Sequence, residues 1–137
     1  MKVEMITTGL LSVNTYFLIN EETKTCVLID GGENYSAVKT TAERLGVTIT
    51  TELLTHSHFD HSGNAAQLQK DGVKVYASYK DGEKLKKGDD LSFGARKKSG
   101  FIPDGVLYDG DDLVLEGIRI KVIATPGHSD GSLVFEV

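Results

Sequence analysis

The side chains best suited to chemistry in this chain are its histidines, three of which fall within residues 56–61. This segment contains His56, His58, Asp60 and His61. Imidazole nitrogens and carboxylate oxygens are ligands that zinc takes in proteins. Because residues i and i+2 of an extended segment point to the same side, His56 and His58 can bind one metal ion. Asp60 and His61 follow in a tighter turn and are expected to face a neighbouring position.

The fourth histidine, His128, lies far along the chain in the segment Thr-Pro-Gly-His-Ser-Asp-Gly-Ser. A catalytic zinc ion keeps three protein ligands and a water molecule. His128 is the histidine left to complete such a site with His56 and His58, and the Pro-Gly pair before it is typical of a fixed loop that aims a side chain inward. A lone histidine usually has a structural role, but this spacing predicts a metal site.

Strands and helices alternate in the first half of the chain, and the histidine cluster lies at a strand end. We expect strands near residues 2–8, 15–20, 25–30, 47–54 and 73–77 and helices near 35–45 and 64–71. The apolar run before Asp30 is typical of a strand buried on both faces. In such α/β patterns, sites form just beyond the strand ends. The Asp-Gly-Gly turn at residues 30–32 lies at one of these ends.

The second half of the chain breaks this alternation. Residues 80–104 are rich in lysine and glycine, and we predict an exposed flap or insertion with one strand in it. A solvated surface is the simpler interpretation of these lysines, and a clamp for an anionic substrate is the alternative. Further strands are expected near residues 113–115, 118–124 and 132–137, as a meander.

Length, charge and cysteine content narrow the class of protein. The 137 residues fit one domain, here 1–137. The net charge of −5 argues against nucleic acid or an anionic membrane as the main partner. This charge alone names no substrate, and the expected partner is a small-molecule substrate. The single cysteine, Cys26, favours a reducing cytoplasm, and we expect no secretion signal and no transmembrane segment.

Three motifs together resemble the metallo-β-lactamase superfamily of hydrolases: Asp-Gly-Gly at 30–32, Thr-His-Ser-His-Phe-Asp-His at 55–61 and Thr-Pro-Gly-His-Ser-Asp-Gly-Ser at 125–132. The resemblance covers nearly the whole chain. It implies an α/β (α+β) fold, the αβ/βα sandwich of two facing sheets with helices outside. It also implies a dinuclear metal site along one edge.

The resemblance also implies a role for each candidate residue. His56, His58 and His128 bind the first metal, and Asp60 and His61 begin the second site. The family pattern adds a bridging aspartate and a later histidine beyond residues 132–137, and the chain lacks both. The expected fold is therefore the N-terminal part of the sandwich, with the second half largely missing. Zinc is the expected cofactor, with iron or manganese as alternatives.

The expected activity is hydrolysis by a metal-bound hydroxide, because a bound metal lowers the pKa of its water toward about 7. Asp60 is the candidate catalytic residue that accepts a proton from the water or orients it. Asp30 is expected to orient the metal-binding loop through hydrogen bonds. Substrate candidates are a thioester, lactone, lactam or related ester, and the glyoxalase II-like branch is favoured. The alternative is a truncated metal-binding half-domain without catalytic activity.

An incomplete sandwich would leave one sheet face bare, and a homodimer covering that face is the expected consequence. The residues expected on the bare face are apolar and come from several strands: Val3, Met5, Phe17, Ile19, Val27, Ile29, Leu53, Val75, Ile120 and Val122.

Overall fold

The computed structural model describes residues 1–9, 11–88, 100–127 and 131–137. Its strands are β1 (Lys2–Thr8), β2 (Val13–Asn20), β3 (Thr25–Ile29), β4 (Thr48–Leu53), β5 (Lys74–Ser78), β6 (Gly105–Leu107), β7 (Asp112–Leu115), β8 (Ile118–Ala124) and β9 (Leu133–Glu136). Its helices are α1 (Tyr35–Leu45), α2 (Phe59–Ser62), α3 (Ala65–Lys70) and α4 (Tyr79–Lys87).

Strands β1 to β6 form one sheet in sequence order. The first two pairings are antiparallel and the remaining three are parallel. Strand β3 is buried on both faces, as its apolar run predicts. Val27 packs toward the second sheet, whereas Cys26 and Leu28 pack toward the helices. Desolvation on burial raises the pKa of the Cys26 thiol to about 12, so this cysteine stays a protonated, inert core residue.

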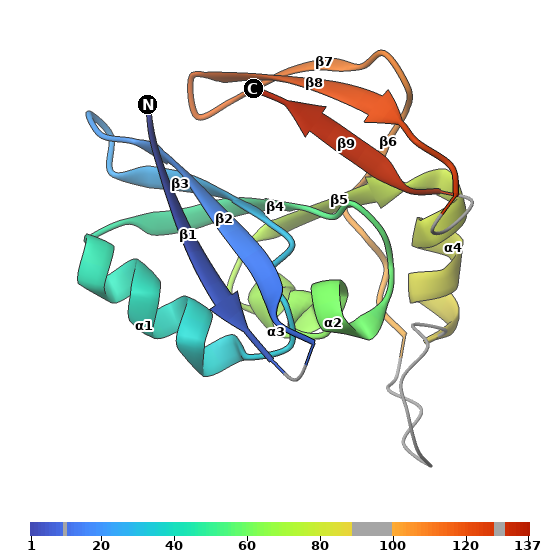
Figure 1. Cartoon of the computed structure of the whole chain (residues 1–137), viewed down its shortest axis with the longest axis horizontal. Helices are drawn as coiled ribbons and strands as arrows, with labels where there is room; N and C mark the ends of the chain where they lie inside the picture. Colours follow the sequence, from blue (N-terminus) through green and yellow to red (C-terminus); the bar gives the residue numbers. More distant parts are fainter. Residues whose placement is uncertain (10, 89–99, 128–130) are drawn as a thin grey trace.

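Strands β7, β8 and β9 form a second, antiparallel sheet that faces the first (Figure 1). Ile118, Ile120 and Val122 of β8 pack against Val27 and Leu53 of the larger sheet and form the core between the sheets. Helices α1 and α3 lie on the opposite side of the larger sheet (Figure 1). The molecule is therefore a layered α/β sandwich.

The sheet face that was expected to be bare is covered by these three strands. The apolar residues assigned to it belong to different layers. Val27, Ile29 and Leu53 meet Ile120 and Val122 across the two sheets, and both groups are buried.

The remaining members of that set lie elsewhere. Phe17 and Ile19 pack toward α1, and Val75 packs beside α4. Val3 and Met5, on the edge strand β1, are 50% and 51% exposed. An apolar surface thus stays open at the edge of the sandwich and not across its face.

The lysine-rich interval 80–104 begins in helix α4, which the sequence analysis did not expect. The Ser78 hydroxyl accepts a hydrogen bond from the Asp81 backbone N–H, and Gly88 ends the helix with φ of 72°. Asp81 and Leu85 are buried, whereas most of the lysines face outward. Residues 89–99 lie outside the described residues, so the flap remains a prediction.

Parallel pairing of β3 with β4 brings the two candidate motifs to one edge. Ile29 lies opposite Leu53, and the Asp30 N–H donates to the Leu53 carbonyl at 3.1 Å. The chain that leaves β4 therefore enters the histidine segment beside the turn at residues 30–32. This is the strand-end position at which α/β sheets form their sites.

Candidate metal centre

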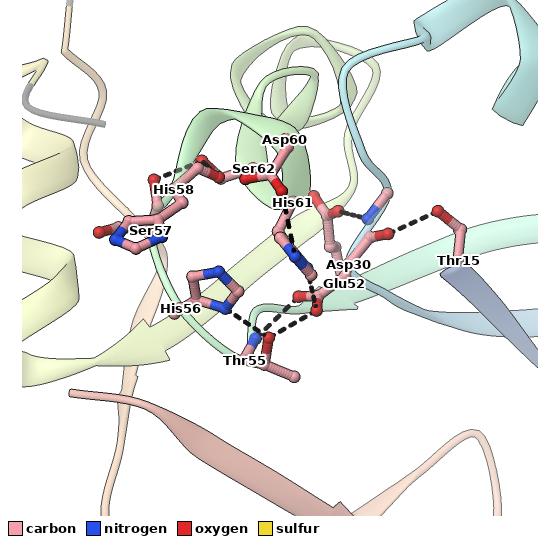
Figure 2. Close-up of polar contacts among 11 residues, drawn as sticks. Thr15, Asp30, Glu52, Thr55, His56, Ser57, His58, Asp60, His61 and Ser62 are labelled. Atoms are coloured by element: carbon pink, nitrogen blue, oxygen red, sulfur yellow. Dashed lines mark hydrogen bonds and ion pairs between the residues drawn. The ribbon is translucent and has the colours of Figure 1, made fainter. Parts of the chain in front are cut away.

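The histidine segment leaves β4 as a short extended loop and then forms the single turn of α2. The backbone N–H groups of His61 and Ser62 donate to the His58 carbonyl at 2.9 and 3.0 Å. The Ser62 hydroxyl donates to the Ser57 carbonyl at 2.8 Å. These bonds close the tight turn that the sequence analysis expected after His58, and they present His56, His58 and His61 toward one another (Figure 2).

The described candidate ligands form two overlapping groups, in each of which the ligand atoms lie within 4.8 Å of one another. One group is His56, His58 and Asp60, and the other is Asp30, His56 and His61. The ring centroids of His56 and His61 are 4.0 Å apart, and those of His56 and His58 are 4.7 Å apart. A cluster of imidazole and carboxylate donors at this spacing fits a zinc-type ion.

Asp30 is 4% exposed and accepts hydrogen bonds from three donors. Its Oδ1 accepts from the Thr55 N–H at 2.8 Å, and its Oδ2 accepts from the Thr55 hydroxyl at 2.5 Å. Oδ2 also lies 2.8 Å from His61 Nδ1. Asp30 has a φ of 50°, a left-handed conformation that aspartate adopts more readily than most residues. Its carboxylate thus links the turn after β3 to the loop after β4.

These hydrogen bonds determine which nitrogen each imidazole offers. The one hydroxyl hydrogen of Thr55 goes to Asp30, so the 2.9 Å contact from Thr55 Oγ1 to His56 Nδ1 requires His56 Nδ1 to be the donor. His61 Nδ1 likewise donates to the Asp30 carboxylate. In the neutral tautomer both rings then carry their lone pair on Nε2, the arrangement of metal-binding histidines with a hydrogen-bonded second nitrogen.

The electrostatic setting of His61 combines opposing effects. Burial disfavours its charged form, but the hydrogen bond to Asp30 and the negative charges of Asp30 and Asp60 outweigh it, and its pKa is raised. Asp60 Oδ2 lies 3.5 Å from His61 Nε2. The same negative field attracts a metal cation.

The turn at residues 30–32 is tied to the elements around it. The Gly31 N–H donates to Glu52 Oε2 at 2.6 Å, and Asn64 Nδ2 donates to the Gly31 carbonyl at 2.8 Å. The Gly32 N–H donates to the His61 carbonyl at 3.0 Å. Thr15 of β2 donates its hydroxyl to the Asp30 carbonyl at 2.6 Å.

His128 lies outside the described residues, and its role as third ligand remains a prediction. The described residues on either side of it do reach the site. The Leu133 N–H donates to the Thr55 carbonyl at 2.8 Å, and the Thr125 N–H donates to the Ser132 carbonyl at 2.9 Å. Leu133, which follows this loop, therefore lies beside Thr55, the residue that precedes His56.

Sequence reasoning missed Thr55, Glu52 and Asn64. Thr55 stands inside the motif, and its hydroxyl could have been considered as a partner for the neighbouring carboxylate. A glutamate within the apolar strand sequence Thr-Glu-Leu-Leu is an unusual core residue and was a detectable signal for Glu52.

A two-sheet sandwich with clustered histidines and aspartates at its strand ends has the form of a metal-dependent hydrolase. The model of the metallo-beta-lactamase superfamily matches residues 8–137, and the chain belongs to this superfamily. The αβ/βα fold class inferred from the motifs is confirmed. Only part of that fold is present. The full sandwich has helices on the outside of both sheets, whereas the described helices of this chain lie against the six-stranded sheet (Figure 1).

Two curated relatives illustrate the similarity. The chain is 29% identical to a hydroxyacylglutathione hydrolase of Serratia proteamaculans over 124 residues, which cover 89% of the chain and 42% of that protein. It is 32% identical to the probable metallo-hydrolase YqgX of Bacillus subtilis over 144 residues, which cover 100% of the chain and 66% of that protein. The chain thus spans less than two thirds of the length of these relatives.

Solved structures agree with this assignment. The BLEG-1 B3 metallo-beta-lactamase superposes with a TM-score of 0.86 at 30% identity, over 98% of this chain and 66% of that one. A beta-lactamase from Chitinophaga pinensis superposes with a TM-score of 0.80 at 25% identity, over 96% of this chain and 52% of that one. No helix among the described residues is long and apolar enough to span a membrane.

Proposed function

We propose that this chain is a zinc-dependent hydrolase that acts on a thioester. The observation that carries the proposal is the group of His56, His58 and Asp60, whose ligand atoms lie within 4.8 Å of one another beside a second group built on Asp30 and His61. A zinc ion held there supplies Lewis acidity toward a substrate oxygen and toward water.

In this proposal, His56 and His58 hold the first ion together with His128, while Asp60 and His61 belong to the neighbouring position. Through its hydrogen bonds with Thr55 and His61, Asp30 keeps the imidazoles of His56 and His61 in the tautomer that presents Nε2 to the metal. Iron or manganese in place of zinc is the alternative within the same donor set.

Asp60 is the proposed catalytic base. It lies at the start of α2, and its side chain is 16% exposed, so water and a substrate can reach it. Its carboxylate can accept a proton from the attacking water, a step that requires a base within hydrogen-bond reach of that water.

The preference for a thioester rests on the relatives named hydroxyacylglutathione hydrolase. The structural relatives named beta-lactamase support a lactam as the alternative substrate. Lactones and phosphodiesters complete the set to be assayed.

The test is hydrolysis of this panel by the zinc-loaded chain, by the chain after chelation and by the chain with zinc restored. Thioester cleavage that is lost on chelation and recovered with zinc is the expected result. Cleavage of the lactam alone would reassign the substrate. A zinc-loaded chain that cleaves no member would favour a metal-binding half-domain without activity, since the chain spans 42% of the Serratia relative.

We also propose a second copy of the chain as the partner that covers the open edge of the sandwich. An apolar groove of about 350 Å³ lies between β2 and β9, and its lining includes Val3, Leu18, Leu133 and Val134. Val3 and Val134 are 50% and 48% exposed. A two-fold dimer would bury this patch on both copies.

A cytoplasmic location is proposed because a single buried cysteine needs no oxidising compartment. Cell fractionation with an antibody to the chain tests it, and recovery outside the cytoplasmic fraction would contradict it.

A further inference from the structure

We propose that Glu52 is a positioning residue of the candidate metal centre, which as a neutral carboxylic acid bridges Gly31 and Asn64 and so holds the turn that aims Asp30. The part of this inference that concerns the metal rests on the proposed function, whereas the protonation and hydrogen bonding of Glu52 do not.

Glu52 occupies a core position of β4. Its Cα partners on the two neighbouring parallel strands are Leu28 of β3 and Val75 of β5, both fully buried. The Glu52 side chain is itself 0% exposed. An aliphatic residue would suit this environment by packing alone, so the carboxyl group must be stabilised by specific hydrogen bonds.

Gly31 provides the first of these bonds and shows how close the groups are. Its N–H donates to Glu52 Oε2 at 2.6 Å, and its carbonyl accepts from Asn64 Nδ2 at 2.8 Å. A Cβ placed on Gly31 would lie 2.6 Å from Glu52 Oε2 and 2.7 Å from Asn64 Oδ1. The carboxyl and the amide therefore both pack closely against the Gly31 backbone.

The remaining oxygens of these two side chains identify the site of a proton. Glu52 Oε1 and Asn64 Oδ1 are both buried, and neither has a hydrogen-bond partner among the described residues. The Asn64 amide cannot turn around without losing its bond to the Gly31 carbonyl. In this proposal a hydrogen on Glu52 Oε1 is donated to Asn64 Oδ1 and satisfies both atoms, whereas an ionised Glu52 would leave both acceptors unsatisfied.

The electrostatic environment favours this protonated form. Burial raises the pKa of Glu52 to about 8, an effect that the Gly31 N–H opposes and the negative charge of Asp30 reinforces. The other groups that face it, Leu28 on β3, Val75 on β5 and Asn64 before α3, carry no charge. The acid is therefore neutral at pH 7.

The bridge acts on the metal centre through the backbone. Asp30 has a positive φ, and the peptide that follows it is the one held by Glu52 and Asn64. Since Asp30 orients Thr55, His56 and His61, the bridge determines where these histidines point. Among the described hydrogen bonds, Glu52 reaches Gly31 and none of the ligand nitrogens, so in this proposal it acts only through Asp30.

The direct test is a pH titration of the ¹³C carboxyl resonances of the metal-free chain, with Glu52 assigned by its loss in Glu52→Gln. Glu43→Gln, at an exposed glutamate of α1, is the matched control. The expected result is a Glu52 midpoint near 8. A midpoint close to the ordinary glutamate value of about 4.3 would overturn the proposal.

Thermal unfolding of wild type and Glu52→Gln gives a second readout. Because the folded-state pKa is raised, the unfolded chain releases this proton first, and wild-type stability falls as the pH rises from about 4.5 to about 8. The amide variant lacks this loss, so the Tm of Glu52→Gln minus that of wild type should increase from about pH 4.5 to about pH 8 and stay constant at higher pH. A constant Tm difference would contradict the proposal.

Zinc titration at pH 7 tests the link to the metal. Glu52→Gln should bind zinc within about twofold of wild type, because the amide can replace both hydrogen bonds, whereas Glu52→Ala should lose about tenfold. Equal affinity of all three proteins would exclude the positioning role. If wild type itself bound no zinc, the proposed function would fail, and the carboxyl titration would still decide the state of Glu52.

Discussion

At the scale of single residues, the site depends on Asp30 as much as on the histidines. Its carboxylate accepts hydrogen bonds from Thr55 and His61. It also orients His56 indirectly, because the Thr55 hydroxyl that donates to Asp30 accepts from His56 Nδ1. Exchange of one such orienting carboxylate typically lowers metal affinity by 10–100-fold.

For Asp30→Asn we expect a loss of about 10–100-fold in zinc affinity, measured by competition with a chromophoric chelator. The amide cannot accept from all three donors, so the two imidazoles lose their fixed tautomer. Asp112→Asn is the control, since Asp112 pairs with Arg119 on the second sheet. Equal zinc affinities of Asp30→Asn and the control would show that the orientation of the histidines does not depend on the Asp30 carboxylate.

For Asp60→Asn we expect retention of zinc at the histidine site with loss of most hydrolytic turnover, because the amide keeps the shape of the side chain and removes the proton acceptor. General-base removal typically costs about 10²–10⁴-fold in rate. Turnover and zinc content are measured on the same sample. Unchanged turnover at unchanged zinc content would rule out the role of Asp60 as base.

The candidate ligands could be predicted from the sequence because the side-chain alternation of an extended segment is local. The network around them could not. Glu52 bonds to a residue 21 positions earlier, and Asn64 to one 33 positions earlier. Such contacts exist only after β3 and β4 have paired, and no local pattern encodes them.

At the scale of elements, the close packing around Gly31 explains why the turn after β3 carries glycine. A Cβ on Gly31 would lie 2.6 Å from Glu52 Oε2 and 2.7 Å from Asn64 Oδ1, which leaves no room for a methyl group. Gly82 of α4 is a useful contrast, since a Cβ there would meet only Pro103 Cγ at 3.8 Å.

We expect Gly31→Ala to lower the free energy of unfolding by about 1–3 kcal/mol, the usual cost of overpacking. Gly82→Ala should raise it by about 0.5–1 kcal/mol, because alanine is the better helix former in open space. Urea unfolding of the three proteins measures both effects. A Gly31→Ala protein as stable as wild type would show that Glu52 and Asn64 can move aside.

Elements with regular apolar spacing were predictable, and those defined by their caps were missed. Helix α1 was expected at the observed residues because Val38 and Ala42 recur at helical spacing between Asn34 and Gly46. Helix α4 was missed because its lysines dominate its composition. Its capping pattern, Ser78 followed by Asp81 three residues later, was the local signal available for it.

At the scale of the whole molecule, three strands are enough to cover the centre of the large sheet but leave its edge open. The expectation that the second half of the sandwich is largely missing did not anticipate that β8 alone would place Ile118, Ile120 and Val122 in the core. The exposed apolar surface is therefore smaller than the strand count suggests.

We expect light scattering at low micromolar concentration to give a dimer, about twice the 14.9 kDa of one chain. Val134→Lys, on the exposed side of β9, should shift it to a monomer, because a charge is costly to bury in an apolar interface. Val114→Lys is the control, at a site on β7 that is 70% exposed. A wild-type monomer with a cooperative unfolding transition would contradict the proposed dimer.

The most direct test of the account is the zinc content of the chain and of His58→Ala, each purified without added metal and measured by elemental analysis. Wild type should hold about one zinc per chain, and the variant should hold almost none, because a three-histidine site loses most of its affinity with one ligand. A variant that kept stoichiometric zinc, or a wild type that held none, would contradict a metal centre built on the histidine cluster.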